Sequence, residues 1–258
     1  MSIKLLASDL DGTLLQNGAL VPSNEAYELI KQLQLKGIVF AASSGRQYHS
    51  LRALFAPIAD EIAYVCENGA LVMYQDKILY SSKMDEQLTN EMLDFLKIHP
   101  EYQTVISGAR SSYTSDKTPQ VAKMMRECYH YAIKEVPDLY NLPEPIIKFS
   151  FYKEEGMNEE DFKLIRKHFG DRATVATSGI TWIDTMEKNI DKSVGMKALA
   201  DALNIDMKDC MAVGDHYNDY EMLQKVGHPV AVNNAQPGIL EICPQKTPSV
   251  EALIKTLL

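Results

Sequence analysis

The chain begins with an apolar stretch that runs straight into two closely spaced carboxylates. Residues 3–8 read as a buried strand, and Asp9, Asp11 and Gly12 follow directly. Side chains two positions apart lie on the same face of a strand, and Gly12 lets the backbone turn sharply after them. Two acids so close need a cation or a shared proton. The pattern predicts a site with a bound divalent metal, or else an Asp-Gly turn whose acids cap the next segment.

A second acidic motif follows another apolar run, residues 210–213. Gly214 ends this run, and Asp215 comes next, at what should be the carboxyl end of a strand. Asn218 and Asp219 fall one turn later, where a helix is expected to begin. An acid in that position is often a helix cap, so Asp219 has a structural reading as well as a functional one.

The two acidic motifs are expected to meet in space. Ligands of open α/β sheets bind outside the carboxyl ends of the strands, so Asp9, Asp11 and Asp215 can converge on one crevice. A site whose ligands are all oxygens suits a hard ion, and Mg²⁺ is favoured over zinc or copper.

A third segment combines a strand with a candidate anion-binding turn. Residues 37–42 read as a buried strand, and Ser44, Gly45 and Arg46 follow before the helical stretch 48–55. Hydroxyl and backbone N–H groups at such a strand-to-helix junction can bind an anion. Ser-Ser-Gly is also ordinary loop composition, so both readings stay open.

Lys192 stands at the start of an amphipathic run that continues through residues 196–203. Positive side chains are mildly disfavoured near a helix N-terminus. The lysine is therefore either simply solvated or directed at a bound anion.

In this order, the four segments resemble the motifs of the haloacid dehalogenase-like (HAD) phosphohydrolases, and within them the Cof-type sugar-phosphate phosphatases with a C2 (IIB) cap. The resemblance spans the whole chain. Its motifs correspond to residues 9–13, 44–46, 192 and 214–219. Ser44 stands where many members have Thr, and either hydroxyl can donate to a phosphate oxygen. Residues 66–70, with Asn68 and Gly69, look like the family's Asn-Gly loop near the substrate, although Asn-Gly alone would be a hairpin turn.

The resemblance implies a Mg²⁺-dependent phosphatase that acts on small phosphorylated metabolites, most of all sugar phosphates. Asp9 would attack phosphorus and form an aspartyl-phosphate, and Asp11 would serve as general acid and base. Mg²⁺ would be held by Asp9, by the backbone carbonyl of Asp11 and by Asp215. Asp219 would support these ligands from the second layer of residues around the metal. Phosphate or substrate contacts are implied for Ser44, Gly45, Arg46, Asn68, Lys192 and Asn218.

Two other functions share much of this pattern. A sugar phosphomutase of the same superfamily would carry every motif, and its dependence on a bisphosphate activator would distinguish it. A non-enzymatic sugar-phosphate sensor would be expected to lack Asp9 or Asp11, and both residues are present.

Composition excludes several classes of partner. With 26 Lys and Arg against 35 Asp and Glu, the net charge of −9 lacks the basic surface of a nucleic-acid binder. No apolar stretch approaches the roughly 20 residues that span a bilayer, and the four cysteines lack the C-x-x-C spacing of a zinc site. We expect a cytoplasmic protein without nucleic-acid or membrane partners, as a monomer or small homo-oligomer.

The order of elements predicts an α/β fold: a Rossmann-like parallel-sheet core, residues 1–82 and 185–258, with an inserted α+β cap, residues 83–184. Strands and helices alternate on both sides of the insert and do not alternate within it. Strands are expected at 3–8, 38–42, 62–66, 102–107, 146–152, 173–177, 181–185, 210–213 and 229–232, and helices at 24–36, 48–55, 86–98, 159–169, 192–203 and 249–258. A hairpin is expected near Asp76, and residues 119–131 form either a helix or a loop.

The insert also contains aromatic residues that could stack on a sugar: Tyr113, Tyr129, His130, Tyr131 and Trp182. Aromatic side chains more commonly serve cores and interfaces. Met124 and Met125 are expected to fill gaps in the core, and His216 is expected to be a loop residue.

Overall fold

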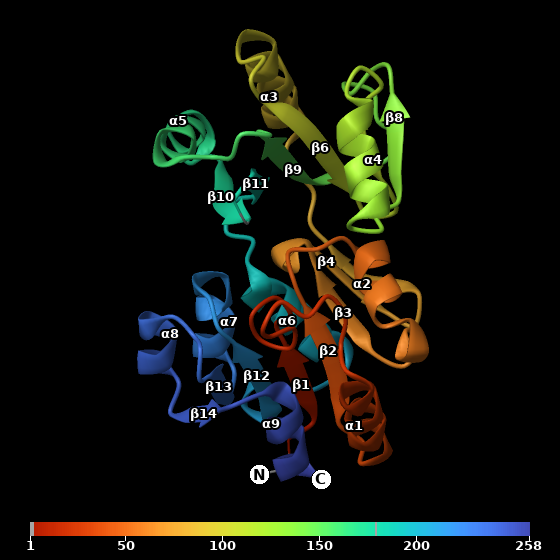
Figure 1. Ribbon diagram of the computed structural model, residues 1–258, viewed down its shortest axis with the longest axis vertical. Helices are drawn as coiled ribbons and strands as arrows, with labels where there is room; N and C mark the ends of the chain where they lie inside the picture. The colour runs from red at the N-terminus through yellow and green to blue at the C-terminus, as the bar shows by residue number, and fades with distance from the viewer. Residues whose placement is uncertain (1–2, 179) are drawn as a thin grey trace. The chain divides into compact units, whose positions relative to one another are not determined.

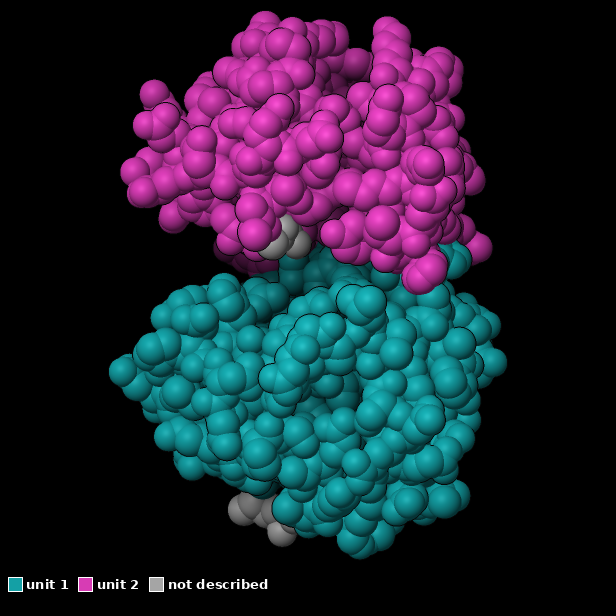
Figure 2. Space-filling view, in the orientation of Figure 1, with its two compact units in different colours: residues 1–80, 191–258 teal, residues 81–190 magenta. Residues whose placement is uncertain are grey.

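The computed structural model describes residues 3–178 and 180–258, with Ser178 described for its backbone only. The chain forms two compact units (Figure 2). Residues 1–80 and 191–258 form the core unit, and residues 81–190 form the cap unit. Each unit has its own sheet (Figure 1).

The core unit is built on an eight-stranded sheet with the order β14-β13-β12-β1-β2-β3-β4-β5. The strands are β1 Leu5–Ser8, β2 Val39–Ser43, β3 Ala63–Cys66, β4 Leu71–Tyr74, β5 Lys77–Ser81, β12 Cys210–Gly214, β13 His228–Val232 and β14 Gln245–Thr247. Neighbouring strands from β14 to β3 are parallel, and β4 runs antiparallel to β3. Ala7 of the central β1 lies between Ala212 and Ala41. The centre of the sheet is therefore alanine-rich and fully buried. Because these strands are parallel, their carboxyl ends lie at one edge of the sheet.

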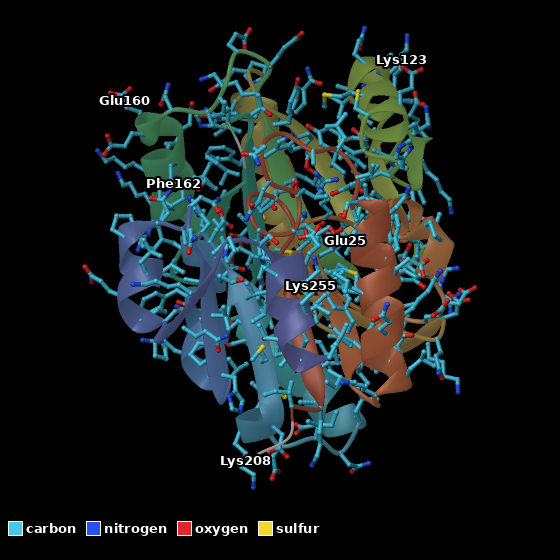
Figure 3. The ribbon with its side chains drawn as sticks, turned by 60° about the horizontal axis from the view of Figure 1, so that its bottom comes forward. Glu25, Lys123, Glu160, Phe162, Lys208 and Lys255 are labelled. Carbon is cyan, nitrogen blue, oxygen red and sulfur yellow. The ribbon has the colours of Figure 1, made fainter. Side chains whose placement is uncertain are left out.

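Helices pack against this sheet: α1 Asn24–Leu35, α2 Tyr48–Leu54, α6 Lys192–Ala202, α7 Tyr220–Lys225, α8 Pro237–Ile242 and α9 Val250–Leu257. The N-cap of α1 is Ser23, whose side chain accepts the N–H of Ala26, as expected for serine at this position. α1 lies beside α9, where Lys255 Nζ is 2.6 Å from Glu25 Oε1 (Figure 3). Because an exposed ion pair contributes only about 0–1 kcal/mol, the buried apolar faces hold these helices in place.

The cap unit contains a six-stranded sheet with the order β10-β11-β9-β6-β7-β8. Its elements are α3 Glu86–Ile98, β6 Gln103–Gly108, β7 Ser112–Ser115, α4 Pro119–Glu127, β8 Ile133–Val136, β9 Ile146–Tyr152, α5 Glu159–Phe169, β10 Ala173–Ser178 and β11 Trp182–Glu187. Phe149, Phe151 and Ile106 point to one face of this sheet and form a core with apolar residues of α3 and α5. Alternation along the strands therefore gives the sheet one strongly apolar face.

The expected α/β class, with a parallel-rich core and an inserted α+β unit, is confirmed. The strand 146–152 and the helices 86–98 and 159–169 have the bounds that the sequence predicted. Four short elements were not expected: β7, β8, α8 and β14.

The expected strand at 181–185 continues as β11 to Glu187, inside the cap unit. The unit boundaries fall after Tyr80 and after Ile190, so the insert is longer at both ends than the predicted 83–184. That the cap unit folds independently stays a prediction. None of the helices in the described part of the chain is both long enough and apolar enough to cross a bilayer.

Candidate active site

The two acidic motifs meet at the carboxyl ends of the neighbouring strands β1 and β12. The backbone N–H of Asp9 donates to the carbonyl of Val213 at 3.0 Å, and Thr13 Oγ1 donates to Asp215 Oδ1 at 3.0 Å. Gly12 has φ +92°, and a Cβ there would lie 2.3 Å from Asp215 Oδ2. Glycine is therefore required for the two loops to approach this closely.

Lys192 joins this group from the first residue of α6. Its side chain is fully buried, and its Nζ lies 2.5 Å from Asp9 Oδ1 and 2.6 Å from Asp219 Oδ1. Burial lowers the pKa of Lys192, but the carboxylates of Asp219 and Asp9 outweigh burial, so that its pKa stays above the ordinary value. The ammonium is therefore charged, and the solvated reading of this lysine is wrong.

Asp219 has a structural role as well as its contact with Lys192. Its Oδ2 accepts the backbone N–H groups of Asp215 at 3.1 Å and of His216 at 3.2 Å. A Cβ on Gly214 would lie 2.6 Å from the Asp219 carboxyl group. Asp219 precedes α7 as expected, but its side chain makes no cap bond to that helix. The carboxylate instead caps the preceding turn, residues 217–219, and so fixes the loop that presents Asp215.

The carboxylates of this site fit a hard cation. Asp9, Asp215 and Asp219 each offer an oxygen within 4.8 Å of the others. Burial, followed by the charge of Asp219, raises the pKa of Asp9, while burial and the charge of Asp9 raise the pKa of Asp215 to about 6. Three neighbouring carboxylates against the single ammonium of Lys192 leave an excess of negative charge, and a bound cation would relieve it. The all-oxygen donor set suits Mg²⁺.

Asp11 lies outside that group and pairs with Arg46. Arg46 Nε donates to Asp11 Oδ2 at 3.0 Å, and Arg46 Nη2 donates to Asp11 Oδ1 at 2.6 Å. Such a two-bond contact fixes the plane of the carboxylate as well as its position. The sequence reading had Arg46 contact the phosphate and gave no signal for this pair, because the two residues come from different strand ends. Whether Arg46 also contacts a phosphate stays a prediction.

The loops after β2 and β3 are joined to each other. The N–H of Asn68 donates to the carbonyl of Ser44 at 3.0 Å, and the N–H of Glu67 donates to the carbonyl of Arg46 at 3.1 Å. A Cβ on Gly45 would lie 3.1 Å from the amide group of Asn68. Asn68 Oδ1 is buried and accepts no hydrogen bond from the described residues. The loops after β2 and β3 thus bring Ser44, Gly45 and Asn68 together, as residues that bind one substrate must be.

The hairpin reading of Asn68-Gly69 is also correct, because residues 67–70 connect the antiparallel strands β3 and β4. Gly69 has φ +95°, and a Cβ there would lie 2.0 Å from the carbonyl oxygen of Asp191. The turn therefore packs directly against the start of α6, where Lys192 begins the helix.

The remaining candidates divide between core and surface. Asn218 and His216 are exposed in the loop that ends at Asp219, and the phosphate contact of Asn218 stays a prediction. In the cap unit, Met125 is buried in an apolar cluster against which Met124, Tyr131 and Trp182 pack, which confirms the core interpretation of the two methionines.

The other cap aromatics differ in exposure. Tyr113 is buried and donates its hydroxyl to Glu144 at 2.7 Å. Tyr129 and His130 are exposed, so of the described aromatic candidates these two are the most open to solvent.

The comparisons with known proteins agree with this geometry. Residues 6–252 match the model of a family described as haloacid dehalogenase-like hydrolase. The chain belongs to this family. The 5-amino-6-(5-phospho-D-ribitylamino)uracil phosphatase of Escherichia coli is 29% identical over 240 residues, which cover 93% of this chain and 89% of the relative.

Two further relatives cover nearly the whole chain. The HMP-PP phosphatase of Serratia proteamaculans is 28% identical over 251 residues, 94% of this HAD-like chain and 88% of the relative. A crystal structure from Eubacterium rectale is 29% identical, covers 99% of both chains and has a TM-score of 0.88. The resemblance of the sequence to the HAD family, Cof type, is thereby confirmed.

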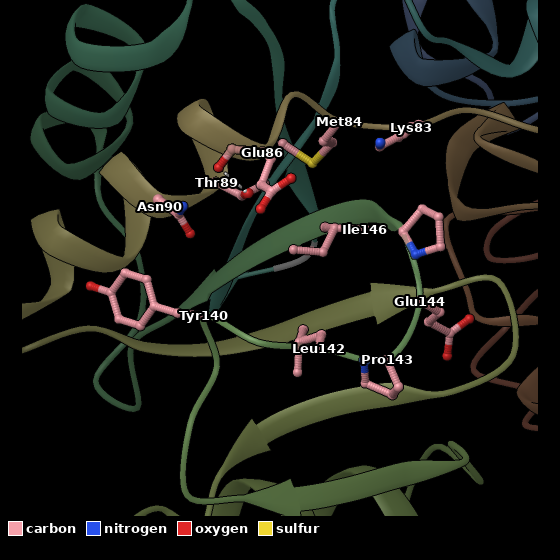
Figure 4. A pocket seen from close by; sticks show the side chains of 11 residues that line it. Lys83, Met84, Glu86, Thr89, Asn90, Tyr140, Leu142, Pro143, Glu144 and Ile146 are labelled. Carbon is pink, nitrogen blue, oxygen red and sulfur yellow. Dashed lines mark hydrogen bonds between the residues drawn. The ribbon is translucent and has the colours of Figure 1, made fainter.

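A cleft of about 300 Å³ lies elsewhere, between α3 and residues 140–146 of the cap unit (Figure 4). Glu144 lines it, but its carboxylate accepts the N–H groups of Arg110 and Ser111 and the hydroxyl of Tyr113. The Glu144 carboxylate therefore stabilises the turn between β6 and β7 through these hydrogen bonds. None of the proposed catalytic, metal or phosphate residues lines the cleft.

Proposed function

We propose that this protein hydrolyses phosphate monoesters of sugars or sugar-like polyols, with Mg²⁺ and through a phosphorylated Asp9. As a HAD-like hydrolase whose relatives are phosphatases, it is a phosphoric monoester hydrolase. The observation that carries the mechanism is the buried contact of Asp9 with Lys192 beside Asp215. The name of the Escherichia coli relative includes a phosphorylated ribityl group, which supports a polyhydroxylated substrate.

Asp9 is the proposed nucleophile. Lys192 donates to its Oδ1 and so favours the ionised carboxylate that attack requires. An oxygen of Asp9 forms a bond to phosphorus while the bond between phosphorus and the oxygen of the departing alcohol breaks. The product is an aspartyl-phosphate, which divides one difficult hydrolysis into two easier steps.

Asp11 is the proposed proton carrier. It donates a proton to the departing alcohol oxygen, and later accepts one from the water that attacks phosphorus. That attack breaks the bond to Asp9, releases inorganic phosphate and restores the free carboxylate. Proton transfer of this kind contributes roughly 10²–10⁴-fold to rate. Arg46, through its two bonds to Asp11, limits the orientations that this carboxylate adopts.

Asp9, Asp215 and the backbone carbonyl of Asp11 would hold Mg²⁺, and Asp219 would keep the loop of Asp215 in position. The ion would neutralise charge as one anion approaches another. The proposed contacts with the non-bridging phosphate oxygens come from Ser44, Lys192 and Asn218, whose donors offset the charge that develops there.

A panel of sugar phosphates, polyol phosphates and p-nitrophenyl phosphate, assayed with and without Mg²⁺, tests the proposal. We expect phosphate release from several of these by the wild type, and none above background by Asp9→Asn or Asp11→Asn with the sugar phosphates. The matched control is Asp201→Asn, an exposed acid on α6, which should retain wild-type rates. Product formation that depends on a bisphosphate activator would instead indicate a phosphomutase, and unchanged release by Asp9→Asn would refute the mechanism.

A further inference from the structure

The loop after β13 contacts the backbone of both acidic motifs. This bridging loop, residues 233–236, follows the strand next to β12, and β1 lies one position further along the sheet (Figure 1). The side-chain amide of Asn234 donates through Nδ2 to the carbonyl of Gly12 at 2.8 Å. The backbone N–H of Gln236 donates to the carbonyl of Asp215 at 2.8 Å. One short loop therefore joins the segment after β1 to the segment after β12.

The bridging loop is itself held by two neighbouring elements. The N–H of Asn233 donates to the carbonyl of Thr247 in β14 at 2.9 Å, and the carbonyl of Gln236 accepts the N–H of Ile239 in α8 at 2.9 Å. These bonds fix the backbone on both sides of Asn234. Its amide can therefore restrain Gly12 instead of following it.

An amide suits this position because it offers a donor and an acceptor at once. Nδ2 of Asn234 faces the Gly12 carbonyl, which can only accept, and Oδ1 accepts from Gln16 Nε2 at 3.3 Å. Gln16 Nε2 also lies 3.2 Å from the carbonyl oxygen of Pro248. These contacts fix the direction in which the Asn234 amide points. A carboxylate or an apolar side chain at this position would leave the Gly12 carbonyl without this donor.

Gly12 is a sensitive point of the first motif. Glycine has more backbone freedom than any other residue, and Gly12 lies so close to Asp215 that a Cβ would be 2.3 Å from the carboxylate oxygen Oδ2. The next residue, Thr13, donates to Asp215 Oδ1 at 3.0 Å. A change in the backbone angles of Gly12 would therefore move Asp215 relative to the backbone of Asp11.

Stability alone gives the bond of Asn234 little importance. Asn234 is exposed, and the net contribution of one hydrogen bond to folding is small. The bond nevertheless acts on two loops that each supply a proposed metal ligand. Because Mg²⁺ demands near-ideal octahedral geometry, a small displacement of one loop weakens the fit of both ligands to the ion.

We propose that Asn234 is a positioning residue of the metal site: its amide fixes the carbonyl of Gly12, and thereby the separation of the loops that carry Asp11 and Asp215. The inference rests on the proposed function, in which the backbone carbonyl of Asp11 and the carboxylate of Asp215 hold Mg²⁺. Asn234 acts through Gly12, so its loss changes the affinity for the cation and leaves the chemistry of Asp9 intact.

Asn234→Leu tests the proposal on the full-length protein, because leucine has about the shape of asparagine and no donor. Mn²⁺, which prefers the same oxygen ligands as Mg²⁺, is titrated into the metal-free protein and followed by electron paramagnetic resonance, a readout independent of turnover. We expect its dissociation constant to rise about 10-fold, the lower end of the range for residues that support metal ligands. The Mg²⁺ concentration for half-maximal activity should rise by the same factor, while kcat at saturating Mg²⁺ should approach that of the wild type.

The matched control is Asn233→Leu, at an exposed neighbour that bonds to Thr247 through its backbone, and it should leave Mn²⁺ binding unchanged. Asn234→Ala repeats the test without added apolar surface, and it decides the question if the leucine variant does not fold. An unchanged Mn²⁺ dissociation constant in a folded Asn234 variant, or an equal rise in Asn233→Leu, would overturn the proposal.

Failure of the proposed function would give a different result. A wild type that binds Mn²⁺ but hydrolyses no ester would refute the phosphatase mechanism, and the comparison of Mn²⁺ dissociation constants would still decide the role of Asn234. A wild type that binds no Mn²⁺ would overturn the metal site and, with it, the role of Asn234.

Discussion

Both units bury charged side chains, but in different proportions and on different kinds of backbone. In the core unit, the ammonium of Lys192 contacts the carboxylates of Asp9 and Asp219, and the carboxylate of Asp215 lies beside these two. All three acids follow strands, in loops or at helix starts. In the cap unit, Lys148 pairs with Asp184 in the middle of two strands. An excess of carboxylates needs a cation, whereas a balanced pair does not. The core unit therefore has an excess of negative charge that suits a bound cation, whereas the buried charges of Lys148 and Asp184 in the cap unit balance.

The largest effect is expected at the core carboxylate that would bond to phosphorus. Asp9→Asn should reduce turnover by at least about 10³-fold, the scale observed when a nucleophile is removed. The amide keeps the shape of the side chain but does not form an acyl phosphate by attack. Steady-state rates with p-nitrophenyl phosphate measure the effect, and circular dichroism checks the fold. Near-normal turnover by the purified variant would contradict the proposed role of Asp9 and remove the catalytic meaning of the core unit's excess charge.

Lys192→Met tests whether the core charges depend on one another. It removes the ammonium that contacts Asp9 and Asp219, so two buried carboxylates lose their partner. Breaking a buried ion pair in this way should lower the free energy of unfolding by about 3–5 kcal/mol. Urea denaturation without Mg²⁺ measures this change. The control is Lys197→Met on the same helix, whose ion pair with Asp201 is exposed and worth at most about 1 kcal/mol. Similar losses of unfolding free energy in the two variants would mean that Lys192 does not stabilise the buried carboxylates of Asp9 and Asp219.

Asp215→Asn tests whether the excess negative charge of the core binds a metal. Chelation should abolish activity of the wild type, and Mg²⁺ should restore it. In the variant, the Mg²⁺ concentration for half-maximal activity should rise about 100-fold, since even residues behind a metal ligand change affinity about 10- to 100-fold. Titration of activity with Mg²⁺ gives this concentration. Full activity of the wild type after exhaustive chelation would show that the reaction needs no bound cation.

The smallest effect is expected at Arg46, whose guanidinium contacts Asp11. Arg46→Met removes both bonds to the carboxylate, and kcat for sugar phosphates should fall about 10-fold, a part of the full acid–base contribution. The loss should be smaller for p-nitrophenyl phosphate, because its leaving group needs less protonation. Arg52→Met, on α2, is the control. An effect confined to KM would show instead that Arg46 binds the phosphate.

Strong periodic segments of the fold were predictable from the sequence. The amphipathic patterns of α3 and α5 and the alternation of β9 fixed both ends of those elements. β7 was missed because its Ser-Tyr-Thr-Ser sequence is polar and short, and its position depends on pairing with β6 and β8. α8 was missed because it has only six residues, too few for a helical pattern of apolar residues to be recognised without a flanking motif.

The candidate site was predictable where function coincides with a strand end. Asp9 and Asp215 follow apolar runs, and a parallel sheet brings such ends together. The pair of Asp11 and Arg46 gave no signal, because contact between two loops depends on tertiary structure. Lys148 and Ser150 alternate with Phe149 and Phe151 in β9, which reveals a polar face. Alternation normally places that face in solvent, so its burial was visible only in the structure.

The central claim is that phosphate is transferred to Asp9 before it reaches water. The direct measurement is rapid quenching of the enzyme during turnover, reduction with borohydride and mass spectrometry of the peptide that contains Asp9. An acyl phosphate is reduced to an alcohol, so homoserine should appear at position 9 in the wild type and at no position in Asp9→Asn. Homoserine at another position, or unmodified Asp9 in a wild type caught during active turnover, would contradict the account.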